Sequence, residues 1–185
     1  MFMELKGPNG FSEKVPLGQL PVLELDNGQL VCQSLSILKF AGKLSKLYPE
    51  DPVKALYVDE FIETIMELYN AAPGHADAEE KLKLRKAWID SKGPKYFSAL
   101  ERMVARNGGP YLLGKEFSIA DLVILRIVGA FLTGDVDGVP KEYITSYRGL
   151  VAAQENASKH PIALAEIAKE AEAKAKAAAT ATAKQ

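Results

Sequence analysis

The amino-acid sequence predicts a chain of the α/β plus all-α class, in which a hairpin and one helix precede a wholly helical region. Val22 to Leu25 and Gln29 to Cys32 are rich in β-type residues and flank Asp26-Asn27-Gly28. Asn-Gly is a strong hairpin signal because both residues tolerate positive φ. From Val53 onward, apolar residues recur at helical spacing and no further alternating segment stands out.

Length, charge and cysteine content limit the possible functions. The chain has 185 residues, enough for a core without disulfides, and its 23 Lys and Arg against 24 Asp and Glu leave no basic excess. We therefore expect neither nucleic acid nor a membrane as a partner. No secretory signal or membrane-spanning run is visible. The single cysteine, Cys32, cannot form a zinc quartet and favours a reducing, cytoplasmic compartment.

The first helix and the linker after it follow from local signals. Ser34 opens a segment whose apolar residues keep helical spacing to about Lys46. In the linker that follows, Asp51 is a favourable N-cap, and Pro52 suits the first helical position because its missing N–H has no partner there. The second helix should therefore begin at this point.

Glycine and proline pairs mark the ends of the later helices. The expected helical segments are 53–72, 78–92, a continuation to Arg106 beyond an interruption at Gly93-Pro94, 119–133, 141–158 and 161–172. Residues 173–185 form an Ala/Lys/Thr tail of low complexity, which we expect to be a fraying helix or disordered and to which we assign no function. The expected domains are 1–46, 47–172 and this tail.

Ser118 and Asp121 have the spacing of a capping box, with Asp in place of the usual Glu. Phe117 before the cap and Leu122 at the fourth helical position would form a hydrophobic staple. The helix that begins here, 119–133, is apolar nearly all round, so it should be the buried central helix.

Ordinary catalytic and metal-binding patterns are weak in this chain. His75 and His160 have no ligand spacing to other residues, so no metal site is expected. Cys32 ends an apolar strand, and a buried small hydrophobic residue is a better interpretation than a catalytic thiol. No nucleophile elbow or complete phosphate loop occurs.

The predicted hairpin leaves a sheet edge to be explained. A lone two-stranded hairpin is marginal in water, and a free edge invites pairing with another strand. Residues 1–13 contain no second alternating segment. The hairpin therefore needs strands from another chain, or the sequence begins inside a domain.

Three ordered stretches resemble the soluble glutathione transferases, in particular the Sigma, Pi and Alpha-like group. They are PLGQLPVLELDNGQLVCQSLSIL at 16–38, LYPEDPVKALYVDEFIE at 47–63 and YLLGKEFSIADL at 111–122. The resemblance runs from about Phe11 to about Ile167. It implies a thioredoxin-like first domain, an all-helical second domain and a homodimer. Glutathione would be a substrate, and no cofactor is implied.

The resemblance also implies glutathione contacts in the first domain. Leu20 matches the residue whose backbone pairs with the cysteinyl backbone of glutathione, and Pro21 matches a cis-proline. Gln33 and Ser34 match the pair that holds the γ-glutamyl end. A plain N-cap is the alternative for that pair. Gln19 matches a position facing the glycyl end.

Further contacts are implied outside this group. Glu67 matches an acidic residue that reaches the γ-glutamyl amine bound to the neighbouring subunit, and Glu63 lies one turn earlier on the same face. A solvated helix face is the alternative for both. Lys14 or Lys6 is a candidate for the glycyl carboxylate. The electrophile would lie against Tyr69, Asn70 and residues near Met66.

The chain departs from the family where the family's chemistry lies. A first strand, helix and second strand, which carry the activating tyrosine, serine or cysteine, should precede residue 1, so the catalytic residue is unknown. Two alternatives stay open: Met1 is not the start of the full protein, or the chain is natural and short. The cost of unpaired strands favours the first.

The function implied is conjugation of the glutathione thiolate to a small hydrophobic electrophile. The alternative is a non-catalytic binding or assembly module that retains the glutathione transferase fold.

Overall fold

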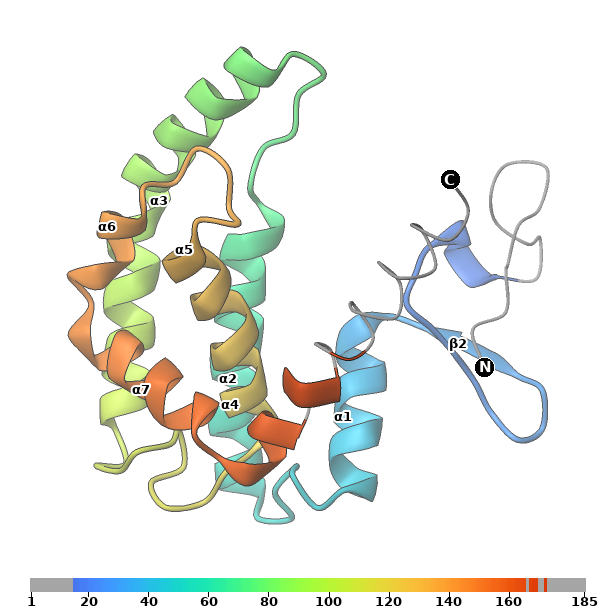
Figure 1. Ribbon diagram of the computed structural model, residues 1–185. Helices are drawn as coiled ribbons and strands as arrows, with labels where there is room; N and C mark the ends of the chain where they lie inside the picture. The colour runs from blue at the N-terminus through green and yellow to red at the C-terminus, as the bar shows by residue number, and fades with distance from the viewer. Residues whose placement is uncertain (1–14, 166, 170–171, 173–185) are drawn as a thin grey trace. The chain divides into compact units, whose positions relative to one another are not determined.

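The computed structural model describes residues 15–165, 167–169 and 172 (Figure 1). The chain divides into two compact units, Met1–Pro49 and Glu50–Gln185. The candidates Lys6 and Lys14 and the tail at 173–185 lie outside the described residues.

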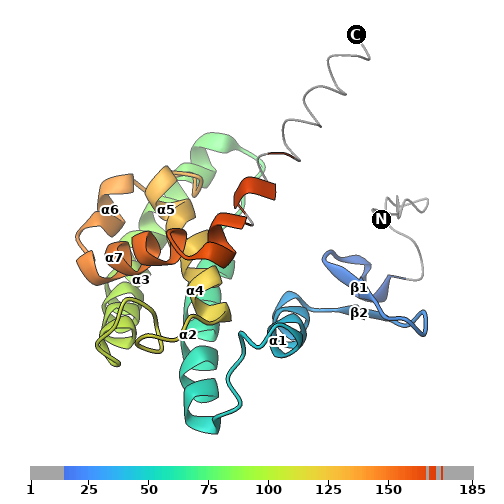
Figure 2. The same ribbon diagram turned by 60° about the horizontal axis from the view of Figure 1, so that its bottom comes forward.

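The first unit contains the predicted hairpin and the helix after it (Figure 2). Its elements are the 3-10 turn η1 (Pro16–Gly18), strands β1 (Val22–Glu24) and β2 (Leu30–Cys32), and helix α1 (Ser34–Leu44). The strands are antiparallel, with Val22 opposite Cys32 and Glu24 opposite Leu30. Gly28 adopts a φ of 79° in the turn, so the hairpin prediction is confirmed. Cys32 is half-buried, which corrects the expectation of a buried side chain.

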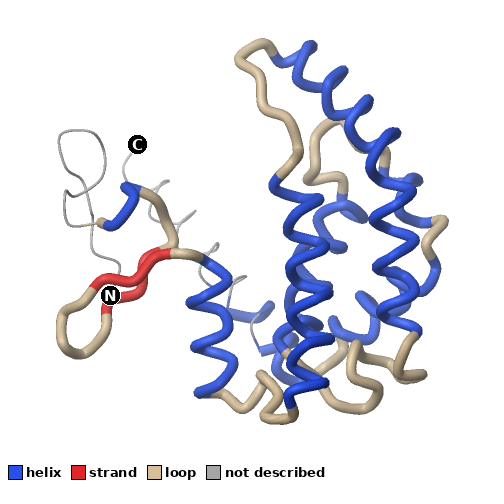
Figure 3. The backbone as a smooth tube through the Cα atoms, turned by 180° about the vertical axis from the view of Figure 1, so that it is seen from behind, coloured by secondary structure: helices blue, strands red, loops and turns tan. Residues whose placement is uncertain are grey.

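The second unit is helical throughout its named elements (Figure 3). These are α2 (Pro52–Asn70), α3 (Ala78–Ala105), α4 (Ile119–Val123), the π-helical turn η2 (Ile124–Val128), α5 (Gly129–Thr133), α6 (Lys141–Thr145) and α7 (Arg148–Ser158). Beyond α7, residues 161–165 and 167–169 are also helical. No described helix is long and apolar enough to cross a membrane.

Helix α2 begins and packs as its sequence predicts. The Asp51 carboxylate accepts the N–H groups of Val53 and Lys54 at 2.9 and 2.8 Å, which satisfies two donors that have no partner inside the helix. Phe61 and Ile65 lie on its fully buried face. Helices α2 and α3 pack side by side and form one wall of the core (Figure 1).

The predicted interruption at Gly93-Pro94 is wrong, because α3 runs through it as one helix of 28 residues. Gly93 is buried, and a Cβ there would meet the Tyr143 hydroxyl oxygen at 2.7 Å. The absent side chain therefore lets the Tyr143 ring approach the helix. The Tyr143 hydroxyl donates to the Ile89 carbonyl at 3.1 Å, and Pro94 lies on the exposed face.

The central helix predicted over 119–133 is present and is formed by α4, η2 and α5 in succession. Its core side chains are fully buried: Ile119, Ile124, Val128 and Phe131. It departs from a uniform helix by the π turn, and Arg126 is exposed rather than covered. Gly134, at a φ of 82°, ends the helix in the left-handed conformation that glycine accepts without a steric cost.

The helix predicted over 141–158 is instead two helices, α6 and α7. Tyr147 leaves the helical region between them, with φ −92° and ψ 74°. Its ring packs 5.2 Å from Phe97, centroid to centroid. Glu101 then accepts the Gly149 N–H at 2.7 Å, so a side chain of α3 satisfies one of the first free donors of α7.

Candidate functional site

The hairpin register brings two predicted groups of site residues together. Because Val22 pairs with Cys32, the residues just outside that pair, Pro21 and Gln33, lie at the same end of the hairpin. Gln19 and Leu20 precede Pro21 in the chain and are exposed, Leu20 at 65%. The predicted cis Leu20-Pro21 bond is present.

The backbone of Gln33 is unusual. It is the N-cap residue of α1 and has φ 82° and ψ 106°, in a region that non-glycine residues rarely occupy. Its side chain makes no capping hydrogen bond to the helix. Strained residues of this kind cluster at ligand-binding sites. Ser34 is the first helical residue rather than the cap, so neither side chain of this pair acts as a plain N-cap.

Glu63 and Glu67 belong to the other unit, where both side chains of α2 are exposed. The Tyr96 hydroxyl of α3 donates to Glu67 Oε1 at 2.5 Å. This hydrogen bond to a carboxylate raises the pKa of the Tyr96 phenol. A neighbouring helix therefore holds Glu67. Tyr96 and Glu67 are 29 residues apart, so no local sequence pattern reveals this contact.

Ser118 and Asp121 form a buried polar cluster at the start of α4. Asp121 Oδ2 accepts the Ser118 N–H at 2.8 Å and the Ser118 hydroxyl at 3.0 Å, while Oδ1 accepts the Leu112 N–H at 2.9 Å. Burial raises the pKa of the Asp121 carboxyl, although the hydrogen bonds from Leu112 and Ser118 oppose that shift. The cluster is structural, since it ties the loop before the helix to the helix itself.

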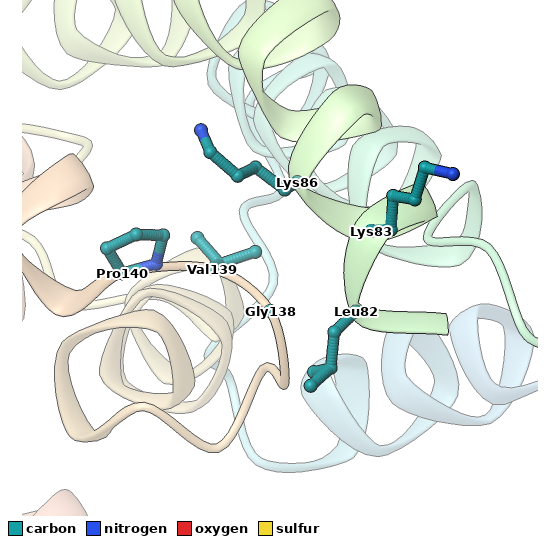
Figure 4. Close-up of a pocket in the computed structure, with 6 residues that line it drawn as sticks. All are labelled: Leu82, Lys83, Lys86, Gly138, Val139 and Pro140. Carbon is teal, nitrogen blue, oxygen red and sulfur yellow. The ribbon is translucent and has the colours of Figure 1, made fainter. Parts of the chain in front are cut away.

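A surface depression of about 620 Å³ lies between α3 and the loop before α6 (Figure 4). Leu82, Val139 and Pro140 are the apolar residues with side chains in its lining. Figure 4 shows Lys83 and Lys86 pointing away from each other. Lys86 pairs with Asp90 at 2.7 Å, and Lys83 lies 3.7 Å from Glu80. The ammonium groups of Lys83 and Lys86 therefore do not converge on one point of the depression.

A second cavity, of about 490 Å³, is lined by the central helix, α7 and Ile167. Its walls combine apolar side chains with Arg126 and Gln154. Sequence reasoning did not single out either polar residue, because no motif surrounds them.

Within the described residues, no group of three or more His, Cys, Asp and Glu side chains is arranged to hold a metal ion. His75 and His160 have local partners instead. His75 Nδ1 accepts the Asp77 N–H at 3.1 Å, and the His160 ring stacks on Phe117 with centroids 3.8 Å apart.

Comparison with protein families gives a match to the glutathione S-transferase C-terminal domain over residues 60–179. Glutathione S-transferase 1 of Ascaris suum is 28% identical over 151 residues, which cover 74% of this chain and 71% of the relative. Human glutathione S-transferase A1 is 31% identical over 117 residues, 60% of this chain and 50% of the relative. The chain thus spans about half to seven-tenths of such relatives.

Solved structures with similar folds agree with this match. Prostaglandin synthase D of Nilaparvata lugens is similar with a TM-score of 0.69 and 27% identity, over 84% of this chain and 76% of that one. A glutathione S-transferase from Ascaris lumbricoides has a TM-score of 0.69 and 25% identity over the same shares. The two-part fold expected from the sequence is confirmed by these likenesses.

Proposed function

The chain belongs to the glutathione S-transferase family, and from this premise we propose that it binds glutathione and joins its sulfur to small apolar electrophiles. The observation that best supports binding is the hairpin register, which places Leu20-Pro21 beside Gln33 and Ser34. The exposed residues Gln19 and Leu20 and the first turn of α1 thus lie at the same end of the hairpin, where both can contact one ligand.

Glutathione is a tripeptide, so a strand edge suits it. In the proposed complex the Leu20 backbone pairs with the cysteinyl backbone, as in strand addition, and Pro21 shapes the wall beside it. Gln33 and Ser34 hold the γ-glutamyl end, where the free amides and dipole of α1 favour a carboxylate. Gln19 faces the glycyl end.

The proposed reaction consumes no cofactor. The cysteinyl thiol loses its proton to water, and the thiolate sulfur attacks an electrophilic carbon to form a C–S bond. The leaving group departs with the electron pair of the bond that breaks, which gives a thioether. Met66, Tyr69 and Asn70, at the end of α2, are the proposed electrophile contacts in the helical unit.

We further propose a homodimer in the cytoplasm. In it Glu67 of one protomer approaches the γ-glutamyl amine bound to the partner, with Glu63 on the same face one turn away. The Tyr96 hydrogen bond supports this role because it leaves one Glu67 oxygen free of that contact. Sedimentation equilibrium should give twice the 20.1 kDa of one chain, and a monomer mass would contradict the dimer.

Two serines of α1 offer a matched test of glutathione binding. Ser34→Ala should weaken glutathione binding by about tenfold in calorimetry, because a charge-assisted hydrogen bond to the ligand is lost. Ser36→Ala changes an exposed serine two residues on and should leave the affinity unchanged. Equal affinities of the two variants would contradict the site.

The second candidate function is a non-catalytic binding or assembly module. A chloro-nitroarene assay on the full chain separates the two candidates. Conjugation above the solution rate supports the transferase. Tight glutathione binding without conjugation supports the module.

A further inference from the structure

The pair of helices α2 and α3 carries an exposed carboxylate whose orientation is fixed. Glu67 lies on α2, and an exposed glutamate on a helix otherwise samples many rotamers, so fixing it costs more entropy than fixing most side chains. The Tyr96 hydroxyl of α3 donates to Glu67 Oε1 at 2.5 Å and limits this freedom. Such charge-assisted hydrogen bonds are shorter and stronger than those between neutral groups.

The core of the helical unit fixes Tyr96 in turn. Phe97, the next residue of α3, is fully buried, and its ring meets that of Phe131 edge-on with centroids 5.2 Å apart. Helices α2 and α3 also pack against each other. The half-buried Tyr96 ring has only two side-chain torsions, so its hydroxyl keeps little freedom relative to the backbone. The direction of the Glu67 carboxylate is thus set by the core through Tyr96.

Tyr96 orients Glu67 without neutralising its charge. Another carboxylate of α2 gives the contrast, because Glu60 Oε2 pairs with the Arg106 guanidinium at 2.6 Å and its charge is offset within the chain. The Tyr96 hydroxyl is uncharged, and in the part of the chain that the structure describes Glu67 forms no ion pair with a Lys, Arg or His. Glu67 therefore keeps its negative charge for a cation from outside the chain.

The Tyr96 hydroxyl is also a donor at every pH at which an amino group is charged. Its hydrogen bond to Glu67 raises the pKa of the phenol above its ordinary 10.0, whereas an α-amino group loses its proton at about pH 8. The oriented carboxylate and an ammonium ligand can thus be present together at neutral pH.

We propose that Tyr96 is a positioning residue, which holds the Glu67 carboxylate toward the γ-glutamyl ammonium of the glutathione bound to the partner subunit. This inference rests on the proposed function and adds the residue that decides how strongly the site distinguishes a peptide with a free γ-glutamyl amine from one without it. Tyr96 acts on that discrimination alone, because among the described residues its hydroxyl bonds only Glu67.

Glutathione and its glutaryl analogue, which lacks only the γ-glutamyl amine, test this role on the full chain. In calorimetry with both thiols kept reduced, the wild-type chain should bind glutathione at least about tenfold more tightly than the analogue. Glu67→Gln should abolish this preference. Tyr96→Phe should lower it at least about threefold by weakening glutathione binding alone, whereas a merely structural defect would weaken both ligands equally.

Tyr57→Phe is the matched control for the loss of a hydroxyl. It changes a tyrosine of α2 but keeps the ring that faces the Arg106 guanidinium at 4.5 Å, so the preference for glutathione should stay at its wild-type value. Tyr96→Leu, which also lacks the donor, takes the place of Tyr96→Phe if that variant does not fold.

The outcomes separate this inference from the proposed function. A wild-type chain that binds no glutathione would overturn both. Glutathione binding without a preference for the amine, or a preference that survives in Glu67→Gln, would overturn the Glu67 contact through which Tyr96 acts. An intact preference in Tyr96→Phe, or equal weakening of both ligands there, would overturn the role of Tyr96 and leave glutathione binding standing.

Discussion

Asp121 shows how much one side chain can organise. It is fully buried and accepts hydrogen bonds from two backbone N–H groups and one hydroxyl. Removing a buried acceptor of this kind is costly, because each donor that loses its partner keeps its full desolvation penalty. The start of the central helix therefore depends on this carboxylate.

Asp121→Asn should lower the free energy of unfolding by about 2–4 kcal/mol. The substitution turns one carboxylate oxygen into an NH₂ group, which would face the N–H of Leu112 or of Ser118 and could not accept from it. Urea denaturation measures the change. Asp90→Asn, at an exposed ion pair with Lys86, should cost less than about 1 kcal/mol. Similar midpoints for the two variants would contradict the role of Asp121.

Tyr96 provides a pH-dependent readout of Glu67. The hydrogen bond to Glu67 raises the phenol pKa above its ordinary 10.0, so the folded chain holds this proton more tightly than the unfolded chain. Its contribution to stability is fully present below pH 10.0 and is lost as pH rises through the folded value.

A tyrosinate absorbance titration, taken as wild type minus Tyr96→Phe, should show Tyr96 ionising later than in a free tyrosine. Glu67→Gln removes the carboxylate and should return the Tyr96 pKa toward its ordinary value. An unchanged Tyr96 titration in Glu67→Gln would show that the two side chains are not coupled.

Sequence spacing revealed only part of these residue contacts. Ser118 and Asp121 lie three positions apart, and their pattern is a known helix-start signature. The Leu112 contact and the Glu67–Tyr96 bond join residues nine and 29 apart, where no local pattern operates. Arg126 and Gln154 share a cavity for the same reason, since only packing brings them together.

At the level of whole elements, α3 shows how tertiary contacts override local signals. Gly-Pro normally ends a helix, because proline lacks an N–H and its ring crowds the preceding turn. Here the Tyr143 ring occupies the space left by Gly93, and its hydroxyl bonds the Ile89 carbonyl. The sequence around Gly93 contains no sign of Tyr143, so the continuity of α3 could not be predicted locally.

Two helical glycines test this packing. Gly93→Ala should destabilise the fold by about 1–3 kcal/mol, because the new Cβ would displace the Tyr143 ring. At Gly129 a Cβ would make only an ordinary 3.6 Å contact with Gln154 Nε2, so Gly129→Ala should stabilise the fold by up to about 1 kcal/mol through helix propensity. Urea midpoints distinguish them, and a stabilising Gly93→Ala would refute the contact.

Hairpin and central helix were predictable because their signals are local. Asn27-Gly28 determines the turn, and a continuous apolar segment after Ser118 determines the buried helix. The break between α6 and α7 was not predictable from the local sequence, because it depends on contacts with Phe97 and Glu101 of α3.

Across the whole molecule, the proposed glutathione contacts fall in both units. Gln19 to Pro21, Gln33 and Ser34 belong to Met1–Pro49, whereas Glu67 belongs to Glu50–Gln185. The order of motifs along the chain was enough to indicate the family. Residue roles in the site remain proposals, because they depend on a ligand and a partner subunit that sequence order does not place.

Amide NMR of the isotope-labelled full chain, titrated with glutathione, tests the central claim most directly. The account predicts saturable shifts concentrated at the amides of Gln19, Leu20, Gln33 and Ser34, while α6 and α7, which contain no proposed glutathione contact, stay unaffected. No saturable shift, or shifts confined to residues outside the end of the hairpin, would contradict it.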